Sequence, residues 1–277
     1  MNSSSILPKL AVLAEALFVQ FVLVGGGQKI IVNSALWKRM GGVEQNALVH
    51  IPSLLIPILL ILLFRWDFNK FGLSFRDANF ALLIALTAYL PALSARLPIA
   101  LTDYTKLSGG VVIAIAHLLA LAVWAWKFQK NLDPKVGIIT IIVSAAVFGG
   151  IAYSQSILPK LNQITLSFTG ALFAVLCEEV LWRGYIQTRL NQIFGMPFSF
   201  FGISWGWGLI ISSLLFGFAH VLNSNPATQQ IGWYWGWGIW TTCAGLFYGL
   251  LREKTGGILA PFIIHGLPQA IALAFGL

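Results

Sequence analysis

Apolar runs of about the length that crosses a bilayer alternate with short polar connections over the whole sequence. Roughly 20 apolar residues in a helix span the hydrocarbon core, and a helix bonds its backbone polar groups within itself. The pattern therefore predicts an all-α fold, a polytopic transmembrane bundle of eight or nine helices. We expect these helices at about residues 10–24, 48–64, 80–93, 111–126, 136–153, 166–183, 207–221, 231–251 and 258–276.

The third of these runs is the least regular. Pro91 and Pro98 interrupt it, and Arg96 follows closely. Because proline lacks a backbone donor and clashes with the preceding turn, it breaks or kinks a helix interior. Of the nine predicted spans, this one therefore has the weakest support from the pattern.

The composition supports a membrane protein. Of 277 residues, 58% are hydrophobic and 9% are charged, which is more apolar surface than a soluble core of this size holds. The formal charge of +8 comes from Lys and Arg that stand singly between apolar runs. We interpret them as topology signals in a lipid bilayer and do not expect nucleic acid as a partner. Cys177 and Cys243 lack CxxC spacing, which indicates packing rather than a disulfide.

The basic residues also predict an orientation. If the N-terminus is cytoplasmic and nine helices cross, eleven of the 17 Lys and Arg residues lie on the cytoplasmic side. Cytoplasmic loops carry an excess of Lys and Arg. This orientation places Arg183 and the turn at Arg252, Glu253 and Lys254 at the cytoplasmic face.

Two adjacent acids and an arginine stand at the end of the apolar run 164–175. An ionisable residue inside a membrane segment is costly to bury and indicates a functional site. Glu179 and Arg183 are four residues apart and share a helix face, so we expect them to neutralise each other. Glu178 points roughly 100° away. It must be met by a side chain from another helix.

Two histidines of the C-terminal helices are candidates to meet Glu178. Glu178 and His220 are placed symmetrically about residue 199, so an antiparallel hairpin would bring them face to face. His265 follows the 254–257 turn by a distance that puts it about 15 Å deep. A carboxylate and two imidazoles open to water fit general-base activation of water with stabilisation of an oxyanion. Gln269, one turn after His265, adds an amide donor.

Other readings of these residues stay open. Glu178, His220 and His265 also form a set able to bind zinc. For His50 and His117 we expect hydrogen bonds between helices, which is the ordinary role of a histidine in a membrane helix. Glu15 in the first helix has no basic residue at helical spacing, so we expect it to hold helices together.

Three ordered motifs resemble those of the CAAX protease and bacteriocin-processing (ABI) family of intramembrane endopeptidases. The resemblance covers about residues 166–277, and each motif falls in or beside an apolar helix. The motifs are Glu178-Glu179-x-x-x-Arg183-Gly184, then Phe216-x-x-x-His220, and then Thr255-Gly256-Gly257 before His265. On this basis we divide the chain into N-terminal helices, 1–163, and a C-terminal catalytic core, 164–277, of one membrane domain.

The resemblance implies a polytopic membrane protease. It leaves room for activation of water by glutamate alone, so we expect no cofactor, with zinc as the alternative. Glu178 would activate water, His220 would assist, and His265 with Gln269 would form the oxyanion hole, supported by Glu179, Arg183 and Phe216. Type II CAAX prenyl endopeptidases of this family remove the last three residues from a prenylated cysteine motif. Bacterial members are linked to bacteriocin self-immunity and peptide maturation. We therefore expect a peptide or lipidated protein as substrate, and a multi-pass protein of the bacterial plasma membrane with its site toward the cytoplasm.

The sequence departs from the family pattern at the last motif. Gln269 stands where the family usually has asparagine, and Pro268 precedes it and tends to kink a helix. Glutamine keeps the amide donor but is one methylene longer. The alternative function is a non-catalytic membrane interaction or bacteriocin-immunity protein of the same fold.

Overall fold

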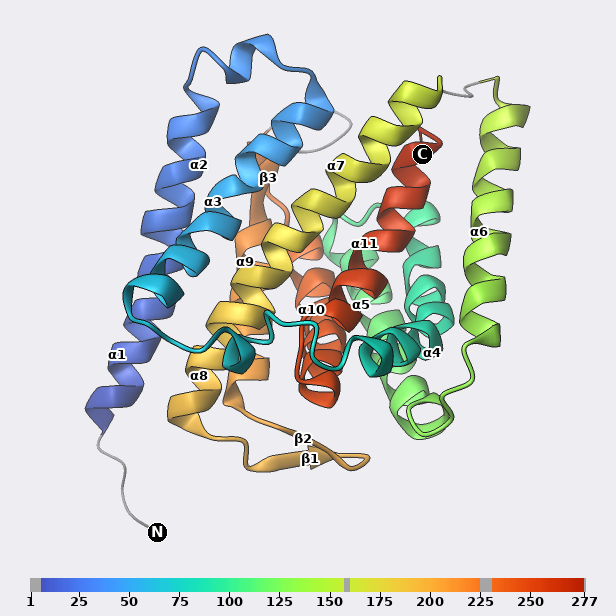
Figure 1. Cartoon of the computed structure of the whole chain (residues 1–277). Coiled ribbons are helices and arrows are strands. Elements are labelled where there is room, and N and C mark those ends of the chain that lie inside the picture. The colour runs from blue at the N-terminus through green and yellow to red at the C-terminus, as the bar shows by residue number, and fades with distance from the viewer. Residues whose placement is uncertain (1–5, 157–159, 225–230, 277) are drawn as a thin grey trace.

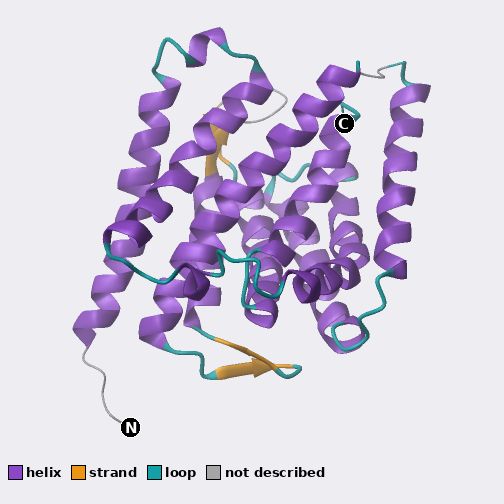
Figure 2. Cartoon of the chain, in the orientation of Figure 1, coloured by secondary structure: helices purple, strands orange, loops and turns teal. Residues whose placement is uncertain are grey.

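The computed structural model describes residues 6–156, 160–224 and 231–276 and confirms the all-α transmembrane bundle (Figures 1 and 2). In these ranges the chain forms nine continuous helical segments, six of them long and apolar enough to cross a membrane. Four short strands form two hairpins. Each predicted helix overlaps one of the nine segments, so the apolar pattern predicted the number and order of the helices.

The six long segments come first along the chain. Three of them contain a π-helical stretch, η1, η5 or η6, and one ends in a 3₁₀ turn, η4. The N-terminal segments are α1 (Ile6–Leu17), η1 (Phe18–Val24) and α2 (Gly25–Val32); α3 (Gly42–Leu63); α4 (Ala78–Arg96) and η4 (Leu97–Ala100); α5 (Leu107–Val123) and η5 (Trp124–Phe128); and α6 (Lys135–Ser154). The C-terminal segments are α7 (Leu161–Glu179), η6 (Val180–Ile186) and α8 (Gln187–Phe194); α9 (Trp207–Val221); α10 (Trp235–Thr255); and α11 (Leu259–Ala274). Two short 3₁₀ turns, η2 (Trp37–Arg39) and η3 (Phe68–Phe71), lie in the connections.

The prolines do not interrupt the helices in the way the sequence suggested. Pro91 lies buried inside α4, which continues to Arg96 before the 3₁₀ turn at Leu97–Ala100. Pro268 likewise lies inside α11, which continues to Ala274. Neighbouring helices can satisfy the backbone groups that a proline frees in a membrane bundle, so the third predicted span is a helix despite its prolines.

Both hairpins occupy positions where the sequence indicated a turn or a helix. The connection after α8 forms β1 (Phe198–Phe200) and β2 (Ile203–Trp205), and their two-residue turn has positive φ at Phe201 and Gly202. Positive φ at both positions matches the twist of paired strands. In the second hairpin β3 (Leu222–Ser224) pairs with β4 (Ile231–Trp233), so α10 begins at Trp235 rather than at residue 231.

Helices from the two halves of the chain pack against each other. α10 lies against α9 and α5, and α7 lies between α3 and α11. In Figure 1, α7 crosses the front of the bundle with α3 on one side and α11 on the other. α5 approaches α10 closely at Gly110, where an added Cβ would lie 2.2 Å from the carbonyl oxygen of Gly236. The position of α7 between two helices decides which side chains can reach its acids.

A buried polar network joins α8 to α10 at the end of the bundle where the β1–β2 hairpin lies (Figure 1). The side chain of Glu253 is 1% exposed and its Oε2 lies 3.1 Å from Nη1 of Arg252. Gln187 and Asn191 donate to its other oxygen at 2.5 and 2.6 Å. Arg252 also donates to the hydroxyl of Thr188 at 2.6 Å. The bonds of Glu253 with Gln187 and Asn191, and of Arg252 with Thr188, hold α8 and α10 together.

We expect Glu253→Ala to lower the thermal unfolding temperature of the detergent-solubilised protein by several degrees. Removing one partner of a buried ion pair costs about 3–5 kcal/mol, because the remaining charge is left without compensation. The matched control is Asp103→Ala, which removes a carboxylate that pairs with Lys106 at 3.6 Å on an exposed loop. Equal unfolding temperatures for the two variants would show that the Glu253 network does not stabilise the bundle.

Candidate active site

The two adjacent acids lie at the C-terminal end of α7, where the helix continues as the π-helical η6. Insertions of π-helical turns are frequent at functional sites because they turn successive side chains in new directions. Glu179 is fully buried, whereas 18% of the Glu178 side chain is exposed. The two carboxylates therefore occupy different environments although they are neighbours in the chain.

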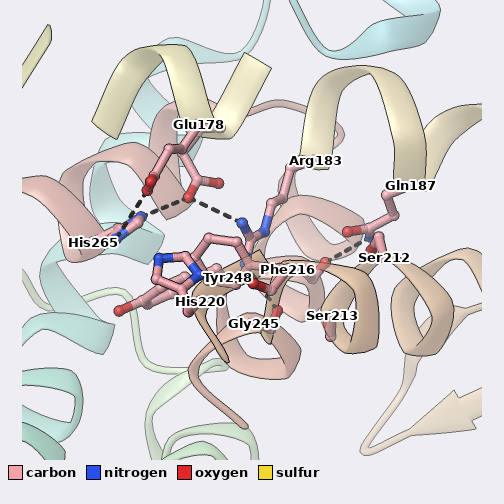
Figure 3. Close-up of polar contacts among 12 residues, drawn as sticks. Glu178, Arg183, Gln187, Ser212, Ser213, Phe216, His220, Gly245, Tyr248 and His265 are labelled. Atoms are coloured by element: carbon pink, nitrogen blue, oxygen red, sulfur yellow. Dashed lines mark hydrogen bonds and ion pairs between the residues drawn. The ribbon is translucent and has the colours of Figure 1, made fainter. Parts of the chain in front are cut away.

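Glu179 is engaged by a cation and an imidazole. Nη1 of Arg183 lies 3.4 Å from its Oε1, as the four-residue spacing predicts, and Nδ1 of His265 lies 2.8 Å from the same oxygen (Figure 3). The guanidinium of Arg183 lies 4.5 Å from the centre of the Phe216 ring, and its Nη2 is 3.4 Å from the carbonyl oxygen of Gly245. Arg183 is thus fixed in place and neutralises Glu179.

Glu178 is met by two histidines from different helices. Nε2 of His265, on α11, lies 3.7 Å from Oε2, and Nε2 of His50, on α3, lies 3.4 Å from Oε1. The expectation that another helix must supply a partner for Glu178 agrees with this arrangement. His50 is not the partner that the sequence suggested.

His220 lies beside this pair of histidines rather than against the carboxylate. Its ring is 4.7 Å from the Phe216 ring, which is also 6.1 Å from the His265 ring. Figure 3 shows Glu178, His220 and His265 in one region of the bundle. Among the described residues His220 forms no ion pair with Glu178, so the symmetrical placement about residue 199 did not produce direct contact.

His50 is the site residue that the sequence did not reveal. It was expected to bond between helices, like His117, and it does so, but its partner is Glu178. The His117 ring instead lies 5.7 Å from that of Trp240 at an angle of 32°, and its Nδ1 bonds within α5 to the carbonyl oxygen of Ile113. The residue is 1% exposed. Both are single histidines in apolar helices, and only the packing of α3 on α7 distinguishes them.

The three site histidines share one protonation pattern. Nδ1 of His50 lies 2.6 Å from the carbonyl oxygen of Asn46, and Nδ1 of His220 lies 2.8 Å from that of Phe216. Nδ1 of His265 faces Glu179. Because a carbonyl or carboxylate oxygen only accepts, we assign the proton of each neutral ring to Nδ1. Each Nε2 then carries a lone pair.

Side chains of α10 and α4 also fix the position of His265. Its ring stacks on Tyr248 with centroids 4.6 Å apart and planes at 18°. Arg96, in the last turn of α4, donates at 2.9 Å to the hydroxyl of Tyr248 and at 2.9 Å to the backbone carbonyl of His265. Gln269 is half-buried one turn further along α11 and has no hydrogen bond in the described part of the chain.

The arrangement does not fit the zinc set of Glu178, His220 and His265. Among the described residues, no group of three or more His, Cys, Asp or Glu side chains has the spacing to hold a metal ion. Nδ1 of His265 is engaged by Glu179, and its Nε2 is 3.7 Å from Glu178. We therefore derive no step through a metal.

Residues 160–271 match the family model described as type II CAAX prenyl endopeptidase, Rce1-like. No curated protein and no solved structure matches the chain. The matched range includes Glu178, His220, His265 and Gln269 but begins after the N-terminal helices that carry His50 and Arg96. The match over residues 160–271 confirms the resemblance to the CAAX protease family that the three motifs predict.

Proposed function

We propose that the protein is an intramembrane endopeptidase that hydrolyses peptide bonds near the cytoplasmic membrane face with water activated by Glu178. The observation that carries the proposal is the inequality of two adjacent carboxylates. Glu179 is bonded to Arg183 and His265, whereas Glu178 faces imidazoles alone. The match to type II CAAX prenyl endopeptidases supports the reaction class.

Glu178 is the general base in this proposal. It has no Lys or Arg partner within the described residues, and its side chain is partly exposed, which gives water access to it. The carboxylate takes a proton from water while the water oxygen attacks the scissile carbonyl carbon. A positioned base of this kind accelerates hydrolysis about 10²–10⁴-fold.

His265 stabilises the oxyanion that forms on the carbonyl oxygen. Its Nδ1 donates to Glu179 at 2.8 Å, so the carboxylate stabilises the ring when Nε2 also carries a proton. In the proposal His265 enters the reaction as the imidazolium, so its Nε2 proton donates to the oxyanion and stays on the ring. Gln269 adds a second donor from the same face of α11, and Nε2 of His220 accepts from the attacking water. No cofactor takes part in these steps.

The substrate we propose is a peptide that is held at the membrane surface, as in C-terminal processing of CAAX type. A lipid anchor on the substrate stays in the bilayer while the scissile bond enters between α3, α7 and α11. Maturation of a membrane peptide or a bacteriocin would use the same chemistry. The charge pattern of the sequence supports a cytoplasmic site, because Arg183 and Arg252 lie toward the side that is richer in Lys and Arg.

We expect Glu178→Gln to lower kcat for cleavage of an internally quenched peptide with a farnesylated CAAX sequence by about 10³-fold. The amide keeps the shape of the carboxylate but cannot accept a proton from water. Glu44→Gln makes the same change at the start of α3 and serves as the control. The unfolding temperature of both variants checks that the fold is kept, and wild-type activity of Glu178→Gln would refute the assignment.

Gln269 distinguishes the enzyme from the non-catalytic immunity protein. We expect Gln269→Ala to lower kcat by about 10²-fold with little change in KM, because the loss of one oxyanion donor acts on the transition state. Gln269→Asn keeps a shorter amide and should retain more activity than the alanine variant. If the wild type, Gln269→Ala and Gln269→Asn all fold but none of them cleaves the peptide, the result would favour the interaction protein.

A further inference from the structure

The contact between His50 and Glu178 requires a shared proton. Nδ1 of His50 is 2.6 Å from the carbonyl oxygen of Asn46, so the ring proton of neutral His50 lies on Nδ1. Its Nε2 lies 3.4 Å from Oε1 of Glu178. A lone pair and a carboxylate oxygen repel at this distance unless a proton lies on one of them. The pair therefore stores one proton next to the proposed attacking water.

We propose that His50 is a further catalytic residue, which gives its Nε2 proton to the leaving amine and is recharged by the proton that Glu178 takes from water. This inference rests on the proposed function. The O–H bond of water breaks as its oxygen bonds the carbonyl carbon, and Glu178 takes the proton while Nε2 of His50 still carries the stored one. The C–N bond then breaks, and the amine nitrogen takes the stored proton from Nε2. The proton on Glu178 moves to Nε2, so that Glu178 and His50 return to their starting states.

The contacts of Glu178 favour His50 over the other two histidines for this proton transfer. His265 faces the opposite oxygen of Glu178, Oε2, and its Nδ1 is committed to Glu179. His220 makes no ion pair with Glu178 among the described residues. His50 alone of the three is at ion-pair distance from Oε1. It comes from α3, outside the residues that match the family.

The test compares His50→Gln with His117→Gln in the full-length protein. The two histidines donate Nδ1 to the carbonyl four residues earlier in the same way, but only His50 faces an acid. We expect His50→Gln to lower kcat for the farnesylated peptide by about 10²–10³-fold with KM nearly unchanged. We expect His117→Gln to stay within about threefold of the wild type, since it removes no proton carrier.

Added imidazole separates a proton carrier from a structural residue. For His50→Ala we expect free imidazole to restore at least about tenfold in kcat, because it can occupy the vacated space and carry the proton. Full activity of His50→Gln beside an inactive Glu178→Gln would overturn the His50 proposal and leave the proposed function standing. A loss in His50→Ala that imidazole does not restore would also overturn it, by showing a structural role only.

A second inference comes from two adjoining cavities at the end of the bundle where Trp66 lies. One cavity, of about 360 Å³, is lined mainly by apolar residues including Phe18, Leu60 and Phe64. The other, of about 430 Å³, is lined by Arg65, Lys70 and Gln192 among others. Trp66 lines both cavities. Together they offer an apolar compartment next to a polar one.

The charged side chains that line the apolar cavity form an ion pair, and stacked aromatic rings form part of its lining. Nε of Arg189 lies 2.8 Å from Oε1 of Glu15 and its Nη2 lies 2.8 Å from Oε2, so the two charges cancel. Tyr185 donates to the same carboxylate at 2.9 Å. The ring of Trp66 stacks on Phe64 with centroids 5.0 Å apart and lies under the guanidinium of Arg189. Such a surface suits a hydrocarbon chain and gives no free charge to a polar ligand.

The polar cavity carries a net positive charge, because Arg65 and Lys70 line it together with the single carboxylate of Asp67. Arg65 and Lys70 are exposed and form no ion pair within the described residues, and the carboxylate of Asp67 is engaged by Asn69 at 2.9 Å. We propose that the two cavities bind an anionic phospholipid, with an acyl chain beside Phe64 and the phosphate at Arg65 and Lys70. A basic residue near a membrane surface contributes about 1 kcal/mol toward an anionic lipid.

Native mass spectrometry of the purified full-length protein with phosphatidylglycerol or phosphatidylcholine tests this site. We expect phosphatidylglycerol to bind more tightly and the double variant Arg65→Gln/Lys70→Gln to weaken it about tenfold or more. The control Lys38→Gln/Arg39→Gln removes the same charge at the other end of α3 and should leave binding unchanged. Equal binding of the two lipids, or an equal effect of the two double variants, would overturn the proposal.

Discussion

The ion pair between Glu179 and Arg183 is the interaction on which the site depends. Two adjacent carboxylates inside a membrane bundle would repel each other and bind protons. Arg183 lies 3.4 Å from Glu179 and is itself fixed by Phe216 and Gly245, so one of the two charges is neutralised permanently. Glu178 is then the carboxylate to which our proposal assigns the exchange of a proton with water.

The second constraint is the packing of α7 between α3 and α11. Each neighbour brings one histidine to a different oxygen of Glu178. Tyr248 and Arg96 fix His265 from the side of α10 and α4, through ring stacking and two hydrogen bonds of 2.9 Å. Four helices, α3, α4, α10 and α11, therefore determine the position of Glu178 on α7 and of the groups around it.

The sequence predicted what depends on local spacing. Apolar runs located the helices, and the four-residue spacing predicted the contact of Glu179 with Arg183. Contacts between distant helices were harder to predict. His50 lies 128 residues before Glu178, and no pattern along α3 separates it from His117. The symmetry argument for His220 assumed a simple turn, but a β-hairpin connects α8 to α9 and alters the path between them.

The most direct test of the account is a double-mutant cycle on kcat/KM with Glu178→Gln, His50→Gln and both changes together. If the two groups handle one proton as a unit, the double variant should be no slower than Glu178→Gln alone. Losses that multiply in the double variant would show that the two side chains act independently. That result would contradict the shared proton at the centre of the site.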